Sequence, residues 1–264
     1  MRMAVAALIL AAVPVALLAG GGGGDDPRDR HRWKPPKLSD PVTVQITNEN
    51  SKLKLDPARD YRLEMPKAPL RAPGGLVVNG GRNVVLDGGV IRIGWQGKSP
   101  TSHQRRGLFL VGQTGTIHVE DLRITGPDLG EGINLDERRG ATVQLVDIRV
   151  DRIRARDERH FSDSHPDLLQ TWAGPRRLRI DGFRGVTGYQ GFFLLPMQFD
   201  RRQRPREVSL RDVSITGVHR SAYLLWTSGD FPIRLRDVRL RSPRRGPLMW
   251  PNRSAWRGVV VRSQ

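Results

Sequence analysis

One eight-residue pattern occurs four times in the chain: IHVEDLRI (Ile117–Ile124), VQLVDIRV (Val143–Val150), VSLRDVSI (Val208–Ile215) and IRLRDVRL (Ile233–Leu240). In each copy, apolar residues recur at every second position until a central Asp, where the alternation changes phase. Alternation with a period of two is typical of a β-strand, so the change of phase predicts two short strands that meet at a bend. Asp suits a bend because its carboxylate can accept hydrogen bonds from nearby backbone N–H groups. Stacked copies would place these aspartates in a ladder at positions 121, 147, 212 and 237.

The pattern repeats at a regular interval. Weaker copies begin at Val84, Leu178 and Val259, and the seven starting points have a mean spacing of about 29 residues, which indicates a solenoid. A third apolar strand precedes most copies, as in GLFLVG, GINLDE, DLLQTW, GFFLLP, AYLLWT and PLMWP. Leucine-rich repeats are shorter, and propeller blades are longer and antiparallel. We therefore predict an all-β, single-stranded right-handed parallel β-helix, a three-sheet solenoid of about seven to eight coils.

Charge and composition limit the partners. The chain has 264 residues, 38% of them hydrophobic, which suffices for one sizeable core. Its formal net charge of +17 favours acidic partners, although a GC-rich genome would also enrich arginine. The arginines alternate with apolar residues and form no basic helix, so we expect no nucleic-acid partner. The absence of cysteine excludes disulfides and a lipoprotein anchor.

The N-terminus is typical of an export signal. Arg2 is followed by an apolar run, Ala4–Ala19, which is short for a membrane span and suits a signal peptide. We predict a signal peptide over 1–19, a flexible linker over 20–41 and the β-helix over 42–264. The mature protein would be secreted or periplasmic, with no membrane attachment after cleavage. A retained anchor is the alternative.

Three segments together resemble the pectate-lyase-like superfamily of right-handed parallel β-helices: GGRNVVLDGG (Gly80–Gly89), GTIHVEDLRITG (Gly115–Gly126) and HPDLLQTW (His165–Trp172). The resemblance covers roughly residues 42–264 and is to exported bacterial members of largely unassigned activity. It implies the fold and a carbohydrate-related role, because the superfamily includes pectate and alginate lyases, polygalacturonases, epimerases and non-catalytic adhesins. The paired-Asp and Gly-His-Gly motifs of polygalacturonases and the Arg-x-Pro-x-x-Arg motif of pectate lyases are absent.

Aligning the third-strand copies by the turn that follows them predicts which side chains face outward. Asn134 and Asp136 would point outward, and Ile133 and Leu135 inward. The alignment gives one outward row of Phe109, Asn134, Leu169, Phe193, Leu224 and Met249, and a second of Val111, Asp136, Thr171, Leu195, Trp226 and Pro251. Gln170 would face the core. So apolar a face is either a sugar-stacking groove or a covered surface. As substrate-binding residues we predict Asn134, Asp136, Phe193, Trp226 and Arg105.

A polar row precedes that face and contains Arg105, Gly130, His165, Tyr189, Arg220 and Arg245, with Asp167 beside it. β-Elimination on a uronate needs a neutralised carboxylate, a base for the C5 proton and an acid for the leaving oxygen. Arg220 could neutralise, His165 or Tyr189 could move the protons, and Asp167 could orient His165. Alternatively, Ca²⁺ held by carboxylates would neutralise, with Asp163, Asp167 and Asp136 as its ligands. The structural alternative is that His165 caps a strand and Asp167 binds turn amides.

These residues predict an exported protein acting on an acidic polysaccharide, with lyase chemistry and His165, Asp167, Tyr189 and Arg220 as catalytic residues. One alternative is a non-catalytic cell-surface or polysaccharide-binding β-helix using the same face. A lower-ranked alternative is a glycoside hydrolase with carboxylates chosen from Glu131, Asp136 and Asp167. It ranks lower because only Asp136 is clearly predicted to face outward.

Overall fold

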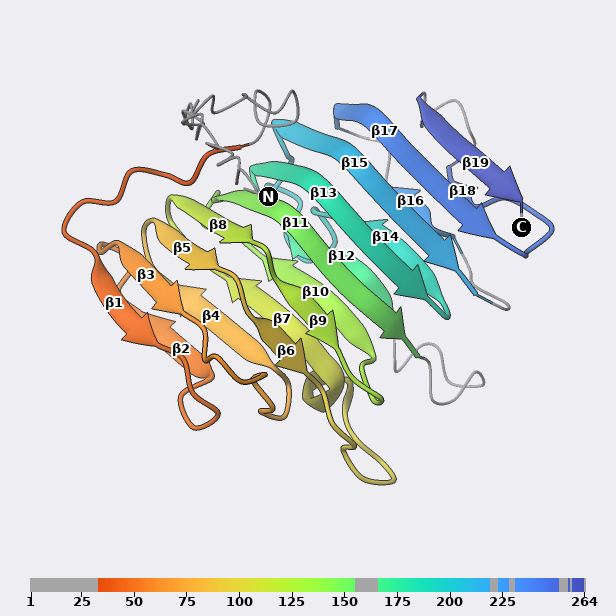
Figure 1. The fold of residues 1–264 in the computed structure, drawn as a ribbon. Coiled ribbons are helices and arrows are strands. Elements are labelled where there is room, and N and C mark those ends of the chain that lie inside the picture. The colour runs from red at the N-terminus through yellow and green to blue at the C-terminus, as the bar shows by residue number, and fades with distance from the viewer. Residues whose placement is uncertain are drawn as a thin grey trace, which may run out of the picture. The chain divides into compact units, whose positions relative to one another are not determined.

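The structure is a computed structural model that describes residues 33–154, 166–218, 223–227, 231–251, 256 and 258–263. Residues 33–264 belong to one compact unit. The described chain is all-β, apart from short 3-10 turns such as η2 (Ser102–Arg105), and its strands pair in parallel within two sheets (Figure 1). This arrangement is consistent with a parallel β-helix. The predicted signal peptide lies outside the described residues, among which no helix is long and apolar enough to cross a membrane.

The larger sheet has eleven strands: β1 (Val42–Gln45), β3 (Tyr61–Glu64), β5 (Val84–Asp87), β6 (Val90–Arg92), β8 (Thr116–Glu120), β9 (Arg123–Thr125), β11 (Thr142–Ile153), β13 (Arg177–Thr187), β15 (Glu207–Gly217), β17 (Ile233–Ser242) and β19 (Val259–Ser263). The smaller sheet has eight: β2 (Lys52–Leu55), β4 (Leu76–Gly80), β7 (Arg106–Val111), β10 (Glu131–Asp136), β12 (Asp167–Ala173), β14 (Gln190–Leu194), β16 (Leu225–Thr227) and β18 (Met249–Trp250). Consecutive coils contribute neighbouring strands to each sheet, so residues about 19 to 36 positions apart lie side by side.

The core contains the predicted inward positions. Ile117, Val119, Leu122 and Ile124 are each at most 1% exposed, and Val143 pairs in register with Ile117. Aliphatic side chains of successive coils therefore stack on one another between the two sheets and remove apolar surface from water. This confirms the repeat and its phase.

The predicted bend is present and has one conformation in every copy. Asp121, Asp147, Asp212 and Asp237 have positive φ angles of 51°, 49°, 46° and 53°. Gly182 (φ 76°) occupies the equivalent position on β13. The left-handed region is reached most easily by Gly and then by Asn and Asp, which explains why the bend position is restricted to Asp or Gly.

The prediction of three sheets is wrong in one respect: the described residues form two. The bend uses a single left-handed residue, so the hydrogen-bonded ladder continues past it. Val146 pairs with Asp181 before the bend and Ile148 with Phe183 after it. The two strands that the sequence predicted around each Asp therefore belong to one eleven-stranded sheet, as β11 and β13 show in Figure 1.

Candidate functional site

A buried polar row crosses the first residues of four neighbouring strands of the eight-stranded sheet. Arg106 of β7 pairs with Glu131 of β10, and Asp167 of β12 pairs with Gln190 of β14. The pairing of Ile133 with Leu169 brings Glu131 and Asp167 into the same register. All four row residues are at most 5% exposed. Neighbouring strands are about 4.8 Å apart, so a guanidinium, two carboxyl groups and an amide are aligned beneath the surface.

Glu131 is held in place by two donors. The Arg106 Nε–H donates to Glu131 Oε2 at 2.8 Å, and Asn134 Nδ2 donates to the same oxygen at 2.6 Å. Arg106 also lies 3.1 Å from the Nδ1 atom of His103, through its terminal nitrogen. Charge-assisted hydrogen bonds of this kind are strong and directional. Glu131 is therefore an anchored carboxylate in a buried ion pair.

Asp167 has the opposite surroundings. It is fully buried, and among the described residues neither of its carboxyl oxygens has a hydrogen-bond partner. Burial raises the pKa of Asp167 well above its usual range, and the nearby charge of Glu131 raises it further. Burial, followed by the charge of Asp167, also raises the pKa of Tyr189. The environment of Asp167 favours its protonated form, and Asp167 lies next to the ion-paired Glu131.

Aromatic rings cover the anchored end of this row. The ring centroids of Phe109 and Trp172 are 5.0 Å apart, although their strands are two steps apart in the sheet, about 9.6 Å. The rings therefore lean toward each other over the strand of Asn134, which is 0% exposed. The Arg106 guanidinium lies 4.5 Å from the Phe109 centroid and 5.0 Å from that of Trp172. Phe199 meets Trp172 edge-on at 6.0 Å.

Further aromatic residues continue across the later coils. Phe193 and Trp226 pair in register, with ring centroids 4.9 Å apart. Tyr223 lies 5.4 Å from Trp226 and 5.9 Å from Trp250, and Trp250 is 49% exposed. Aromatic faces of this kind stack on the apolar faces of sugars. The sheet therefore carries an aromatic track in the direction in which the coils stack.

The predicted register of this face is wrong in part. The outward row is Phe109, Asn134, Gln170, Phe193, Trp226 and Trp250. Leu169 and Met249 lie in the inward row instead. Leu224 comes one position before the residue of its coil that lies in that inward row. The cause is a bulge after Leu135, where β12 carries one residue more, so that Asp136 pairs with Ala173. Counting back from the turn therefore shifts the alignment by one, and Gln170, predicted inward, shares the row of Asn134.

Of the predicted catalytic residues, the structure brings Asp167 and Tyr189 together, as their electrostatic interaction shows. His165 and Arg220 lie outside the described residues.

The predicted substrate-binding residues have different environments. Phe193 and Trp226 belong to the aromatic track. Asn134 has the predicted orientation but is buried, and it holds Glu131. Arg105 is also buried: its Nε–H donates to Asp128 at 3.1 Å, and its Nη2 donates to the Arg154 carbonyl at 2.6 Å. These bonds join Arg105 to two other segments of the chain, and its role in substrate binding stays a prediction.

The carboxylates proposed for calcium are not assembled in the described part of the chain. No three His, Cys, Asp or Glu residues gather there as a metal site. Asp136 accepts from Arg138 Nε at 2.7 Å, and Asp163 lies outside the described residues.

The sequence analysis missed Arg106 and Gln190. A signal for both was present: RGLFL, EGINL and QGFFL each place a polar residue before a Gly and an apolar strand. At Gly132, a Cβ would lie 2.3 Å from the Leu168 carbonyl oxygen and 3.2 Å from a Val150 methyl group. The Gly therefore marks a tight turn of the strand into the core, and the residue before it lies in the polar row.

We compared the chain with protein-family models, curated proteins and solved structures, and none of them matches it.

Proposed function

We propose that this protein is a carbohydrate-active enzyme that cleaves a glycosidic bond on the outer face of the eight-stranded sheet. The observation that carries the proposal is the carboxyl pair at one register position of β10 and β12, with Glu131 in an ion pair and Asp167 without a hydrogen-bond partner in the part of the chain that the structure describes. The aromatic track beside it supports a polysaccharide as substrate. We further propose that the coils are right-handed and that the chain is an exported member of the pectate-lyase-like superfamily, on the resemblance and the apolar run described above.

The proposed reaction is hydrolysis. Asp167 donates its proton to the glycosidic oxygen as the bond from that oxygen to the anomeric carbon breaks. Glu131 either attacks this carbon or takes a proton from the water that does so, as in the two established geometries. Trp172 exchanges its contact with Phe109 for the face of the sugar, which brings the bond to the buried pair. Water supplies the hydroxyl of the new reducing end, and Asp167 regains a proton.

Hydrolysis is favoured over the elimination predicted from the sequence. Elimination needs a cation directed at the uronate carboxylate. Within the described residues the cation of this row is Arg106, and it is engaged by Glu131. The raised pKa of Asp167 favours an acid beside the ion-paired carboxylate of Glu131, and hydrolysis uses a pair of this kind. The carboxylates of the lower-ranked alternative thus become the leading candidates, with Asp136 removed from the set.

The test is release of reducing ends from a panel of neutral and acidic polysaccharides by the full chain. Asp167→Asn and Glu131→Gln should each lower the rate by about 10²–10⁴-fold, while Asp151→Asn, a half-buried carboxylate of the other sheet, should leave it unchanged. Reducing ends should appear without the ultraviolet absorbance of an unsaturated uronate. Growth of that absorbance would instead establish a lyase, and full activity of both variants would exclude this carboxyl pair.

A second candidate is a non-catalytic polysaccharide-binding protein, which the aromatic track favours independently. In that case no polysaccharide yields product, and binding survives Asp167→Asn but weakens in Trp226→Ala. Measuring binding and cleavage with the same two variants distinguishes the two functions.

A further inference from the structure

A cavity lined almost entirely by arginine lies where three successive coils pass from the eight-stranded to the eleven-stranded sheet. Its volume is about 320 Å³. The lining residues are Arg138, Arg139, Gly140, Arg176, Arg202, Gln203, Arg204 and Arg206, so six of the eight carry a guanidinium and none carries a carboxylate. Arginine is effectively always charged. The cavity therefore has a positive potential, which attracts anions.

The fold brings these arginines together by stacking. They lie in the turns after β10, β12 and β14. The Arg176 N–H donates to the Ala141 carbonyl at 3.0 Å, and the Arg206 N–H donates to the Arg176 carbonyl at 2.8 Å. The turns are thus in register, and their backbones follow one another about 4.8 Å apart, so that arginines of successive coils line the same space. This produces a line of positive charges across the coils.

Among the described residues, most of this charge has no carboxylate partner. Asp136 pairs with Arg138 at 2.7 Å and Asp200 with Arg202 at 3.1 Å. Hydrogen bonds from Arg202 hold the pKa of the Asp200 carboxyl at about 2. Within the described part of the chain, no ion pair is formed by the other four: Arg139, Arg176, Arg204 and Arg206. Four like charges facing one space repel one another, and a bound anion would relieve that repulsion.

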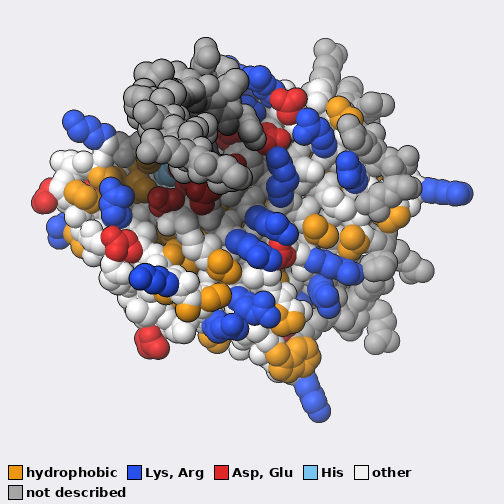
Figure 2. All heavy atoms as spheres, in the orientation of Figure 1, with side chains coloured by type: hydrophobic (Ala, Val, Ile, Leu, Met, Phe, Trp, Pro, Cys, Tyr) orange, Lys and Arg blue, Asp and Glu red, His pale blue; other side chains and the backbone are white. Residues whose placement is uncertain are grey.

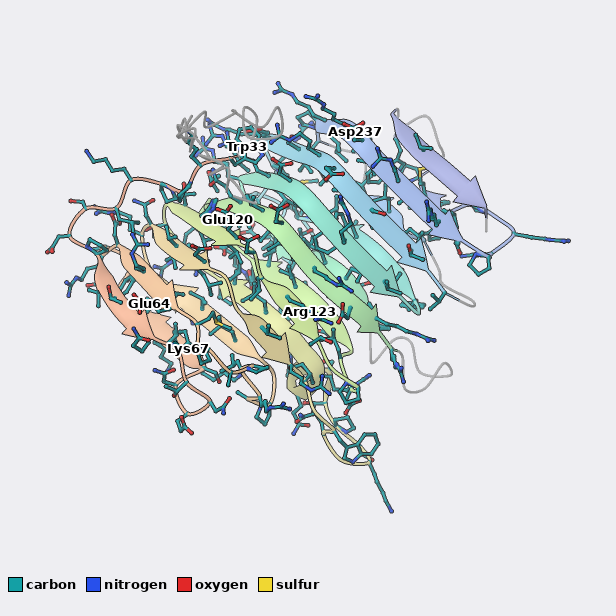
Figure 3. All side chains as sticks on the ribbon, in the orientation of Figure 1. Trp33, Glu64, Lys67, Glu120, Arg123 and Asp237 are labelled. Carbon is teal, nitrogen blue, oxygen red and sulfur yellow. The ribbon has the colours of Figure 1, made fainter. Side chains whose placement is uncertain are left out.

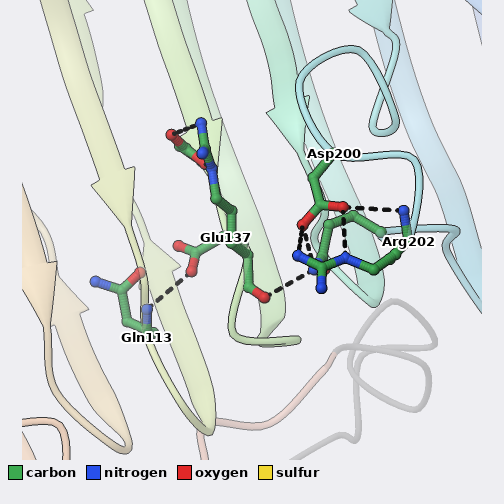
Figure 4. Close-up of polar contacts among 7 residues, drawn as sticks. Gln113, Glu137, Asp200 and Arg202 are labelled. Carbon is green, nitrogen blue, oxygen red and sulfur yellow. Dashed lines mark hydrogen bonds and ion pairs between the residues drawn. The ribbon is translucent and has the colours of Figure 1, made fainter.

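The wall that carries three of the arginines is fixed in place. Gln203 Nε2 donates to the Arg138 carbonyl at 2.8 Å and lies 3.3 Å from Asp200 Oδ2, which Arg202 also contacts (Figure 4). These bonds join the segment after β14 to the turn after β10, two coils earlier. The cavity is therefore preorganised.

We propose that this cavity binds the carboxylate or sulfate groups of an acidic polysaccharide. Guanidinium groups bind such oxyanions with paired hydrogen bonds, and a line of charges across coils suits a polymer that repeats its acid groups. The lining contains no aromatic side chain on which nucleobases could stack, which disfavours a nucleic acid. The inference rests on the proposed function in one respect only, which is that it takes the polymer to be a polysaccharide. The cavity is separate from the carboxyl pair, because Glu131 begins β10 and the cavity lies beyond the end of that strand.

The test compares two triple variants of the full chain that have the same net charge. Arg139→Gln/Arg176→Gln/Arg206→Gln alters the cavity, and Arg59→Gln/Arg62→Gln/Arg71→Gln removes three exposed arginines from earlier coils. The probes are fluorescent oligogalacturonate and a fluorescent heparin fragment, followed by anisotropy at low and high salt. For at least one probe the cavity variant should weaken binding about tenfold or more, and the control less than about threefold. Binding should also weaken with salt.

Several outcomes would overturn the proposal. Equal losses in the two variants would show that net charge alone attracts the polymer, and unchanged binding in the cavity variant would exclude the site. Tighter binding of an oligonucleotide of equal charge, lost in the cavity variant, would reassign the cavity to a phosphate polymer. If the triple variant does not fold, Arg139→Gln/Arg206→Gln replaces it, because both of these side chains are exposed.

The Asp167→Asn variant separates this inference from the proposed function. It should bind both probes as the parent chain does, whether or not the parent cleaves any polysaccharide. If cleavage fails and cavity-dependent binding persists, only the proposed function is wrong. If cleavage occurs without cavity-dependent binding, only the cavity assignment is wrong.

Discussion

The outer faces of the two sheets use the same ion-pair chemistry in opposite environments. On the eleven-stranded sheet, Arg123 and Arg149 pair with Asp151 at 2.6 and 2.9 Å, and both arginines are at least half exposed. Lysine and arginine side chains are spread over this face (Figure 2), where Figure 3 labels Arg123. On the eight-stranded sheet, Arg106 and Glu131 pair at 2.8 Å with side chains only 5% and 7% exposed.

This difference bears on function because exposed and buried pairs have different costs. An exposed pair adds little stability and is screened by salt, so it can accumulate on a solvated face. A buried pair must overcome the desolvation of two charges, and apolar residues of similar size are often as stable there. Stability alone does not require the pair of Arg106 and Glu131, and the catalytic role that we propose for Glu131 would account for it.

The largest stability effect should come from breaking the buried pair. Arg106→Ala leaves Glu131 charged and buried without its partner, so we expect a loss of about 3–5 kcal/mol in the free energy of unfolding. Arg149→Ala on the exposed face should lose about 1 kcal/mol or less. Urea unfolding measures both.

A double substitution sharpens that result. Arg106→Met/Glu131→Met should recover much of the lost stability, because it removes both charges, but it should remain inactive. If Arg106→Ala and Arg149→Ala lost similar amounts of stability, or if the double variant were active, the contrast between the two faces would disappear.

Two buried carboxyl groups should give opposite pH dependences. Asp167 has a raised pKa, so its contribution to stability is complete below about pH 4 and is lost as the pH rises toward the folded-state value. Asp60, before β3, has its pKa lowered to about 2, chiefly by its hydrogen bond with Arg82. Its contribution is complete above about pH 4 and is lost as the pH falls toward 2.

Asp167→Asn should therefore become more stable relative to the parent as the pH rises above about 4. Asp60→Asn should be less stable than the parent at neutral pH, by about 1–3 kcal/mol, with the difference shrinking in acid. Urea unfolding between about pH 3 and about pH 8 follows both variants. Parallel profiles would show that the two carboxyl groups share one environment.

The left-handed bend of the eleven-stranded sheet gives a smaller effect. Asp121 has a φ of 51°, so Asp121→Ala should cost about 1–2 kcal/mol and Asp121→Gly clearly less, because Gly adopts this conformation without a Cβ penalty. Thermal unfolding of the two variants checks the order. If Ala were the better replacement, the strained backbone would not be what selects Asp at this position.

The sequence predicted the eleven-stranded sheet better than the site, for a physical reason. Ile117 and Val143 recur in a pattern that local alternation fixes on both sides of Asp121 and Asp147, and the left-handed bend requires particular residues. Parallel stacking then follows from the period. Whether the bend divides one sheet into two depends on ladder hydrogen bonds between coils, which no single copy of the pattern contains.

The register of the eight-stranded sheet was harder to predict because its strands differ in length. One extra residue near Trp172 moved Gln170 from the predicted core to the outer row and placed Asp167 level with Glu131. A one-residue shift reverses which side chains face outward. The sequence predicts Asp167 and Tyr189 as site residues, but the structure places Glu131 in register with Asp167, and the role that we propose for Asp167 differs for that reason.

The smallest expected effect tests the exposed side of the comparison. Arg184 Nη2 lies 2.9 Å from Asp212 Oδ2, with side chains 53% and 42% exposed, and Arg239 approaches the same carboxylate at 3.7 Å. A double-mutant cycle of Arg184→Gln and Asp212→Asn preserves the left-handed bend, since Asn also tolerates positive φ.

We expect a coupling energy of about 0.5 kcal/mol or less at low salt. Because the Debye length falls to about 3 Å at ~1 M salt, this coupling should vanish there. A coupling above about 2 kcal/mol that persists at high salt would show that pairs on this face are as strong as buried ones. The ion pair of Arg106 and Glu131 would then no longer stand out as a mark of function.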